Sequence, residues 1–250
     1  MPGTLKSFPV KKFIIRCCIW NYAPVISAPT PITMTAASNP YLARLLHQRL
    51  PRVCVALTAS DPTELVDKAE GLVRDNTFLE FRLDYLSKPL LALPKIKRFT
   101  EYYPHVVVIA TCRRIASGGK FRGTVASQLE ILGKATAAGC QIVDVELQTA
   151  SHCKPAQLQR LRDKASLILS FHDFRATKKL EETLEKMVHF PADFYKIVTT
   201  ATTLYDNVVM MKFLERHRDQ HSLSASVWAS KGSSVVYWAY GRAVYLPLQH

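Results

Sequence analysis

The chain repeatedly alternates short apolar runs with segments of helical periodicity. The first apolar run, residues 52–57, has strand length and precedes Asp61, Pro62 and Glu64. These three residues predict a helix with Asp61 as N-cap, Pro62 at the first helical position and Glu64 completing a capping box. Continuous apolar runs are typical of strands in parallel sheets, which are covered on both faces. The alternation therefore predicts repeated strand–helix units around a parallel sheet.

The same pattern recurs along the chain until about residue 228. Further strands are predicted at residues 78–83, 106–110, 142–147, 166–170, 195–198 and 224–228. Helices are predicted from Leu93-Pro94 to before Pro104, then at residues 125–138 with Gly139 as cap, and at 156–163, 180–187 and 204–215. No glycine-rich dinucleotide or phosphate-loop motif follows the first strand, which disfavours an open doubly wound sheet. Seven strands favour an α/β fold of the closing (β/α)8 TIM-barrel type.

The net charge of +13 does not indicate nucleic-acid binding once its distribution is considered. Seven of the 33 basic residues precede Asp61, the first acidic residue, and two follow Asp219, the last. The 24 basic and 20 acidic residues between them leave a mild excess that suits an anionic small-molecule substrate. A basic stripe interleaved with aromatic residues is not found, so we expect no nucleic-acid partner.

The six cysteines and the hydropathy pattern indicate a reducing, cytoplasmic protein. Cys54, Cys112 and Cys140 lie in or beside apolar runs, where buried thiols are ordinary, and no pair has zinc-ligand spacing. No stretch reaches the ~20 apolar residues of a membrane helix. Residues 13–20 follow three lysines as in a signal peptide, but Arg16 interrupts the apolar run. We therefore expect no metal, no membrane association and no export.

Polar residues lie at the ends of the predicted strands, where catalytic side chains of a barrel converge. They are Glu80, Arg82, Asp84, Arg113, Glu146, His172 and Lys196. Glu80 and Arg82 project to one face of their strand, as either a structural ion pair or part of a pocket. Arg113 could hydrogen-bond a neighbouring loop or pair with a substrate carboxylate.

Lys196 and His172 together suggest imine chemistry on a ketone. Lys196 lies among apolar and aromatic neighbours, and burial would lower its pKa from ~10.4 and supply the neutral amine that a Schiff base requires. His172 would be the adjacent general base, although a histidine considered alone is more often a loop residue or a cap. These residues predict a catalytic pair if the fold brings the two strand ends together.

Five motifs carry a resemblance to a known family. They are Leu-Glu-Phe-Arg-Leu-Asp at 79–84, Thr-Cys-Arg at 111–113 before Gly118-Gly119, Asp-Val-Glu-Leu at 144–147, Ser-Phe-His-Asp-Phe at 170–174 and Tyr-Lys-Ile at 195–197. Over about residues 51–219 the chain resembles type I 3-dehydroquinate dehydratase, a (β/α)8 barrel of the shikimate pathway and of aromatic amino acid and chorismate biosynthesis. The resemblance implies that Lys196 forms the imine and His172 moves the protons. It also implies that Glu80, Arg82 and Arg113 hold 3-dehydroquinate, without metal or cofactor.

The resemblance further implies a shikimate dehydrogenase, fused or adjacent, as a partner, and we keep a homodimer as an expectation.

Two departures from the family stand out. Ser117 occupies the place of a glutamate that hydrogen-bonds the catalytic histidine. We expect its hydroxyl to orient the imidazole. Because a hydroxyl cannot stabilise the charged imidazole as a carboxylate does, we also expect slower proton transfer. Only 22 residues follow Trp228, and Val236 stands where an arginine is expected. We therefore predict a disordered leader at 1–40 and a barrel at 41–250, truncated after the seventh strand, with an incomplete or atypical last unit from about residue 229.

Two other hypotheses stay open. One is a non-enzymatic, ligand-sensing relative of the dehydratase, although retention of His172 and Lys196 favours descent from an enzyme. The other is a frameshift or a misassigned end that replaced the tail, favoured by the absence of acidic residues after Asp219.

Overall fold

The computed structural model describes residues 14–15, 54–217, 223–229 and 234–235. They form one sheet whose strands follow the chain order from β1 to β9. Seven strands are mutually parallel, and the short β1 and β9 flank them in the antiparallel direction. The strands are β1 (Ile14–Ile15), β2 (Cys54–Leu57), β3 (Phe78–Arg82), β4 (Val107–Thr111), β5 (Ile142–Glu146), β6 (Ser166–His172), β7 (Phe194–Ala201), β8 (Leu223–Ala229) and β9 (Ser234–Val235).

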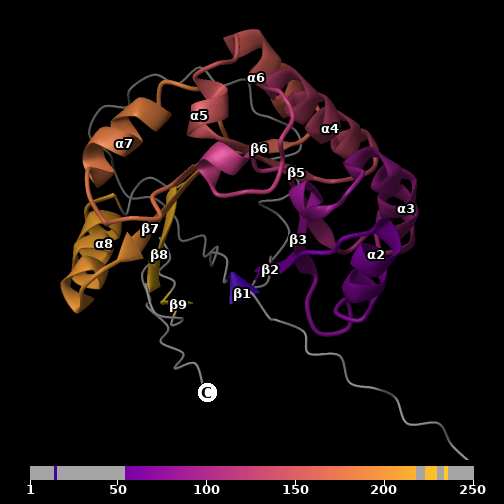
Figure 1. Cartoon of the computed structure of the whole chain (residues 1–250), viewed down its shortest axis with the longest axis horizontal. Helices are drawn as coiled ribbons and strands as arrows, with labels where there is room; N and C mark the ends of the chain where they lie inside the picture. Colours follow the sequence, from indigo (N-terminus) through magenta and orange to yellow (C-terminus); the bar gives the residue numbers. More distant parts are fainter. Residues whose placement is uncertain (1–13, 16–53, 218–222, 230–233, 236–250) are drawn as a thin grey trace, which may run out of the picture.

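Helices cover the outside of the curved sheet, in the arrangement of an incomplete α/β barrel (Figure 1). They are α2 (Pro62–Glu70), α3 (Pro89–Tyr102), α4 (Val125–Ala137), α5 (Leu147–Ala150), α6 (Pro155–Arg162), α7 (Leu180–Met187) and α8 (Leu204–Arg216). The α/β barrel prediction is confirmed, and within the described ranges β8 is the last of the parallel strands. None of the described helices has the length and apolar character needed to span a membrane.

Two apolar layers result from the alternation of side chains along the strands. Outward-facing residues such as Leu79, Val143 and Leu169 join the helices in the main core. Inward-facing residues form a second, smaller cluster: Cys54, Phe78, Val107, Ile109, Ile142 and Ile168, with Phe194 packed against it. Because a residue two positions further along a strand shares its face, a polar layer follows directly above this inner cluster. Its members are Glu80, Thr111, Asp144, Ser170 and Lys196.

The first predicted helix start is confirmed, and only its capping box differs from the prediction. Asp61 Oδ1 accepts hydrogen bonds from the backbone N–H groups of Thr63 (2.8 Å) and Glu64 (3.1 Å), which confirms Asp61 as the N-cap of α2. Glu64 Oε2 accepts from the backbone N–H of Ser60 (3.0 Å) rather than that of Asp61, so the reciprocal bond of the predicted capping box is displaced by one residue. The first N–H groups of a helix have no intrahelical acceptor, and the Asp61 carboxylate satisfies two of them, those of Thr63 and Glu64.

The prediction for α3 is wrong at its start. The helix begins at Pro89 and continues through Pro94 to Tyr102, because Pro89 occupies a first-turn position where no N–H is required. Pro94 removes one intrahelical hydrogen bond, and burial of Ala92, Ile96 and Phe99 against the sheet offsets that loss.

The end of α4 differs from the prediction by one residue, because the helix ends at Ala137 with Ala138 as C-cap and Gly139 directly after it. Gly139 has φ of +91°, and a Cβ there would lie 2.3 Å from Thr100 Oγ1, so glycine is required for both reasons.

Several sequence predictions fall on residues outside the described ranges. The leader at 1–40 does so except for Ile14 and Ile15, and so do residues 41–53 and most of the segment after 229.

A buried ion pair joins α6 to the starts of β6 and β7. Asp193 Oδ1 accepts from Arg162 Nη2 at 2.6 Å, and Oδ2 accepts from the Leu167 backbone N–H at 2.8 Å. We expect Asp193→Ala to lower the free energy of unfolding by about 3 kcal/mol, because a buried cation and a buried N–H lose their acceptor. Denaturant unfolding measures this, and Lys134→Ala, which removes only an exposed pair with Glu130, should cost at most about 0.5 kcal/mol. Equal losses in the two variants would contradict the expectation.

Candidate active site

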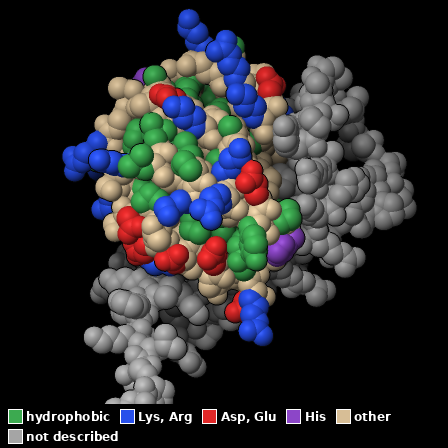
Figure 2. Space-filling view, turned by 90° about the vertical axis from the view of Figure 1, so that its right-hand side faces the viewer, with side chains coloured by type: hydrophobic (Ala, Val, Ile, Leu, Met, Phe, Trp, Pro, Cys, Tyr) green, Lys and Arg blue, Asp and Glu red, His purple; other side chains and the backbone are tan. Residues whose placement is uncertain are grey.

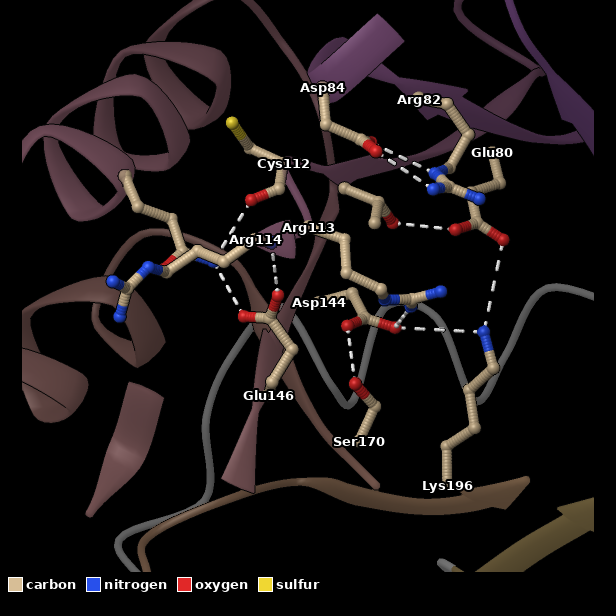
Figure 3. A network of polar contacts seen from close by, with 12 residues as sticks. Glu80, Arg82, Asp84, Cys112, Arg113, Arg114, Asp144, Glu146, Ser170 and Lys196 are labelled. Atoms are coloured by element: carbon tan, nitrogen blue, oxygen red, sulfur yellow. Dashed lines mark hydrogen bonds and ion pairs between the residues drawn. The ribbon is translucent and has the colours of Figure 1, made fainter. Parts of the chain in front are cut away.

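The amine of Lys196 lies between two buried carboxylates inside the sheet. Lys196 Nζ is 3.8 Å from Glu80 Oε2 and 3.6 Å from Asp144 Oδ2. The Lys196 side chain is 12% exposed and each carboxylate 1% exposed. Figure 3 shows both carboxylates directed toward Nζ from β3 and β5, with the lysine entering from β7. The inward-facing register thus converts three distant sequence positions into one charged cluster.

Each carboxylate also accepts a hydroxyl hydrogen bond. Thr111 Oγ1 donates to Glu80 Oε1 at 2.7 Å, and Ser170 Oγ donates to Asp144 Oδ1 at 2.6 Å. Burial by itself would raise the pKa of both acids, but the charges of Lys196 and Arg113 outweigh burial and hold each pKa below its ordinary value. Both groups are therefore ionised near neutral pH.

Arg82 pairs with Asp84, not with Glu80. Its Nε and Nη2 donate to the two oxygens of Asp84 at 2.9 and 2.8 Å, a bidentate pair, and its guanidinium carbon lies 4.9 Å from the centre of the Tyr85 ring. The backbone N–H of Lys120 donates to Asp84 Oδ2 at 3.1 Å and brings the loop after β4 to this pair. A structural pair between Glu80 and Arg82, one of the sequence alternatives, is not formed in the described part of the chain. Three N–H donors of Arg82 are left over from the bidentate pair.

Arg113 extends from the end of β4 toward Asp144. Its side chain is 5% exposed, and Nη2 lies 3.2 Å from Asp144 Oδ2. Its Nε is buried and lacks a hydrogen-bond partner among the described residues. A Cβ at Gly119 would lie 2.0 Å from the Arg113 carbonyl oxygen, so only glycine permits the loop to fold back here. The guanidinium therefore belongs to the charged cluster rather than to a neighbouring loop.

His172 lies at the end of β6, beside the strand that carries Lys196. Ser170 is in register with Lys196, and His172 is in register with Val198. The pKa of His172 is lowered well below 6.5, chiefly by burial and to a smaller extent by the positive charges of Arg113, Lys196 and Arg82. The imidazole is therefore neutral near pH 7 and suited to accept a proton.

The expected bond between Ser117 and His172 is not formed. Ser117 Oγ donates at 3.5 Å to Gln148 Oε1, and His172 Nδ1 is buried without a hydrogen-bond partner among the residues described. The expectation that the Ser117 hydroxyl orients the imidazole is wrong for Nδ1. The His172 ring stacks on Phe174 instead, with centroids 5.9 Å apart and planes 17° apart.

Glu146 anchors the loop after β4. Its Oε1 accepts from the Arg114 backbone N–H at 2.7 Å, and its Oε2 accepts from Gln128 Nε2. Gln128 also donates to the carbonyl oxygen of Cys112 at 2.9 Å. Figure 3 places Glu146 on the Arg114 side of the network, with Asp144 between it and Lys196. Burial raises the pKa of Glu146, and the position fits support of the residues around Arg113.

The five residues predicted to share the site all lie in or beside this cluster: His172, Lys196, Glu80, Arg82 and Arg113. Asp144, Ser170 and Thr111 also belong to it and were not predicted as site residues. Asp144 and Glu146 are two residues apart on one strand, as Glu80 and Arg82 are, so each pair lies on one face of its strand. This pattern would have identified Asp144 as an inward-facing residue.

The described residues contain no group of three or more His, Cys, Asp or Glu side chains placed to hold a metal ion. A surface groove between α2 and α3 is lined by residues that include Asp67, Lys95 and Tyr102, all outside the sheet. On that face of the molecule, Lys and Arg side chains are interspersed with Asp, Glu and hydrophobic side chains (Figure 2). The groove shares no residue with the charged cluster, so the cluster is the candidate active site.

Comparisons with known proteins show the family to which the chain is similar. A family model described as type I 3-dehydroquinase matches residues 53–239. A 3-dehydroquinate dehydratase of Dehalococcoides mccartyi is 34% identical over 175 residues, 69% of this chain and 73% of that protein.

Two solved structures share the fold. A 3-dehydroquinate dehydratase of Geobacillus kaustophilus has a TM-score of 0.64 at 20% identity, over 73% of this chain and 74% of that one. A structure described as dehydroquinate dehydratase and shikimate dehydrogenase from S. pombe has a TM-score of 0.53 at 22% identity, over 70% of this chain and 35% of that one.

Proposed function

The chain belongs to the type I 3-dehydroquinase family, and we propose that it dehydrates 3-dehydroquinate to 3-dehydroshikimate through an imine on Lys196. One observation carries the proposal: the Lys196 amine lies between the carboxylates of Glu80 and Asp144, beside a neutral His172. The amine nitrogen would attack the ketone carbon, and water would leave as the carbon–nitrogen double bond forms. After elimination, water would hydrolyse the imine and release the product ketone with the free amine.

The two carboxylates suit the charge of the intermediate. A protonated imine carries one positive charge on the lysine nitrogen, as the ammonium does, so the carboxylates stabilise both. Their attraction is stronger in this buried site than it would be in water. The amine must lose its proton before it attacks, and the cationic imine then draws electrons from the adjacent carbon–hydrogen bond.

His172 would carry the proton between two positions on the substrate. As a neutral base, it would remove a proton from the carbon adjacent to the imine, and the electron pair would pass into the conjugated system. The hydroxyl on the next carbon would then leave with that proton from the imidazolium, as water. One residue therefore serves as base and then as acid, and atoms and charge balance over the step.

The arginines would bind the anionic end of the substrate. Arg113 has a buried Nε–H without a partner among the described residues, and Arg82 has donors beyond its pair with Asp84. A guanidinium matches a carboxylate in shape, so either arginine could hold the substrate carboxylate. Glu80 would act chiefly on Lys196, with remaining lone pairs available to a substrate hydroxyl.

A shikimate dehydrogenase as partner is supported by the description of the S. pombe structure, which includes both activities. A cytoplasmic location and a homodimer stay predictions from the sequence.

The direct experiment is turnover by the full chain. Purified protein is mixed with 3-dehydroquinate, and the conjugated ketone of the product is followed by ultraviolet absorbance, with binding measured by calorimetry in parallel. Catalytic product formation supports the proposal. Binding without product would overturn it and favour the ligand-sensing hypothesis.

The pH dependence of kcat/KM provides a further prediction. Because the pKa of His172 is lowered well below 6.5, the residue stays in its base form as the pH falls through 6.5. When kcat/KM is measured from about pH 5 to 8, we expect its fall on the acid side (the acid limb) to occur well below pH 6.5. An acid limb at or above 6.5, in protein shown by circular dichroism to stay folded, would contradict this assignment.

A further inference from the structure

Phe174 is an exposed aromatic residue stacked on the half-buried ring of His172. Its side chain is 53% exposed, while the His172 ring on which it stacks contributes a buried nitrogen to the candidate site. The ring planes are 17° apart and the centroids 5.9 Å apart, which is an offset stacked arrangement. An exposed phenylalanine gains little from burial, so its placement calls for another explanation.

The backbone around Phe174 is fixed on both sides. The Asp173 backbone N–H donates to the carbonyl oxygen of Val198 at 2.8 Å, and Thr200 Oγ1 donates to the Asp173 carbonyl at 3.1 Å. Asp173 Oδ1 accepts from the backbone N–H of Arg175 at 2.8 Å and of Ala176 at 3.1 Å. The segment is thus tied to β7 and closed by a side-chain turn, which sets the direction of the Phe174 side chain.

Gly118, from the loop after β4, contacts the same ring. A Cβ on Gly118 would lie 2.3 Å from both Cε2 and Cζ of Phe174, so the ring packs against bare backbone. Gly118 also has φ of +78°, a conformation that favours glycine. The loops after β4 and β6 therefore meet at the Phe174 ring.

His172 lacks the usual device that fixes a catalytic imidazole. Such rings are generally oriented by a hydrogen bond to the nitrogen that does not react. Here Nδ1 has no hydrogen-bond partner among the described residues, and Ser117 is bonded to Gln148. Among the described residues, the ring contact of the imidazole is the one with Phe174.

We propose that Phe174 is a positioning residue, whose ring, held by Gly118 and the Asp173 turn, fixes the plane of His172 for proton transfer. The inference rests on the proposed function for the reaction that it serves. Misplacement of a reacting group by about 1 Å can cost 10²-fold in rate, so a loosened imidazole should affect kcat rather than KM.

Loss of the Phe174 ring should also change the titration of His172. Water would reach the imidazole and relax the effect of burial, while the positive charges of Arg113, Lys196 and Arg82 would still oppose protonation. The pKa of His172 should therefore rise toward 6.5. A residue that only supported the fold would leave this titration unchanged.

The test compares Phe174→Leu, which removes the flat ring, with Phe174→Tyr, which keeps it. We expect Phe174→Leu to lower kcat by about 10- to 100-fold with a small change in KM, and to move the acid limb of kcat/KM upward. Phe174→Tyr should retain wild-type kcat and pH profile. Wild-type kcat and an unmoved limb in Phe174→Leu would overturn the positioning role.

An NMR titration of the His172 ring separates this inference from the proposed function. An upward shift of the pKa in Phe174→Leu supports the positioning contact even if the wild type yields no product, a result that would overturn only the dehydratase proposal. An unchanged titration overturns the positioning role even if the wild type is active.

A double-mutant cycle tests the contact with Gly118. Gly118→Ala should lower kcat in the wild type, and by a smaller factor in Phe174→Leu, where the shorter side chain removes the ring contact at Cβ. Backbone strain at φ of +78° is common to both backgrounds and cancels. Gly139→Ala, at φ of +91° beside Thr100, is the control: it should reduce stability without moving the His172 titration. Equal factors in the two backgrounds would overturn the role of the Gly118 contact.

Discussion

Replacement of Lys196 by arginine is expected to lower kcat on 3-dehydroquinate by on the order of 10⁴-fold or more, because the variant has no amine that can form an imine. Arginine keeps a positive charge near Glu80 and Asp144, so the buried carboxylates keep a cationic partner. Steady-state turnover and thermal unfolding, measured on the same preparation, separate loss of chemistry from loss of structure.

Arginine is chosen over an uncharged residue for an electrostatic reason. Lys196→Met would remove the cation that lies between Glu80 and Asp144 and leave Asp144 with Arg113 alone, a change that can cost about 3–5 kcal/mol of stability. Lys212→Arg, at an exposed position on α8, should leave kcat unchanged and serves as the matched control. Retention of more than about a tenth of wild-type kcat by Lys196→Arg would rule out the imine as an obligatory intermediate.

Replacement of His172 by alanine is expected to lower kcat by about 10²- to 10⁴-fold, the range for loss of a general acid and base. Imine formation uses the amine of Lys196, so the first covalent step should survive and the substrate imine should accumulate. Rapid mixing followed by intact-protein mass spectrometry would measure that accumulation. The two variants are thus expected to fail at different steps, one before the covalent bond and one after it.

His152→Ala is the matched control for His172→Ala. His152 is exposed, and its Nδ1 lies 2.7 Å from the carbonyl oxygen of Gln148, outside the charged cluster. This variant should keep wild-type kcat. Equal kcat values in His172→Ala and the wild type would remove the histidine from the mechanism.

Most of the fold could be predicted from local patterns. Buried parallel strands produce continuous apolar runs, and the start of the predicted strand at residue 166 and the bounds of α7 agree with the structure. The start of α3 could not be predicted, since the penalty of Pro94 inside a helix is offset by burial that is visible only in three dimensions. The antiparallel pairing of β1 with β2 could not be predicted either, because it joins residues about 40 positions apart and no local sequence pattern indicates it.

The candidate site was predictable in part. Lys196 and His172 follow from polar residues in apolar strands, because burial requires that such groups have a partner or a task. Their partners could not be assigned, because hydrogen bonds such as that from Ser170 to Asp144 depend on register between strands. The orientation of Ser117 away from His172, and the stacking of Phe174 in its place, likewise depend on the paths of two loops.

The most direct test of the imine on Lys196 is reduction with borohydride in the presence of 3-dehydroquinate, followed by peptide mass spectrometry. The proposed mechanism predicts one stable adduct, on the peptide that contains Lys196, with a larger yield in His172→Ala and none in Lys196→Arg. Turnover without any adduct, or an adduct of equal yield on an exposed lysine such as Lys212, would contradict it.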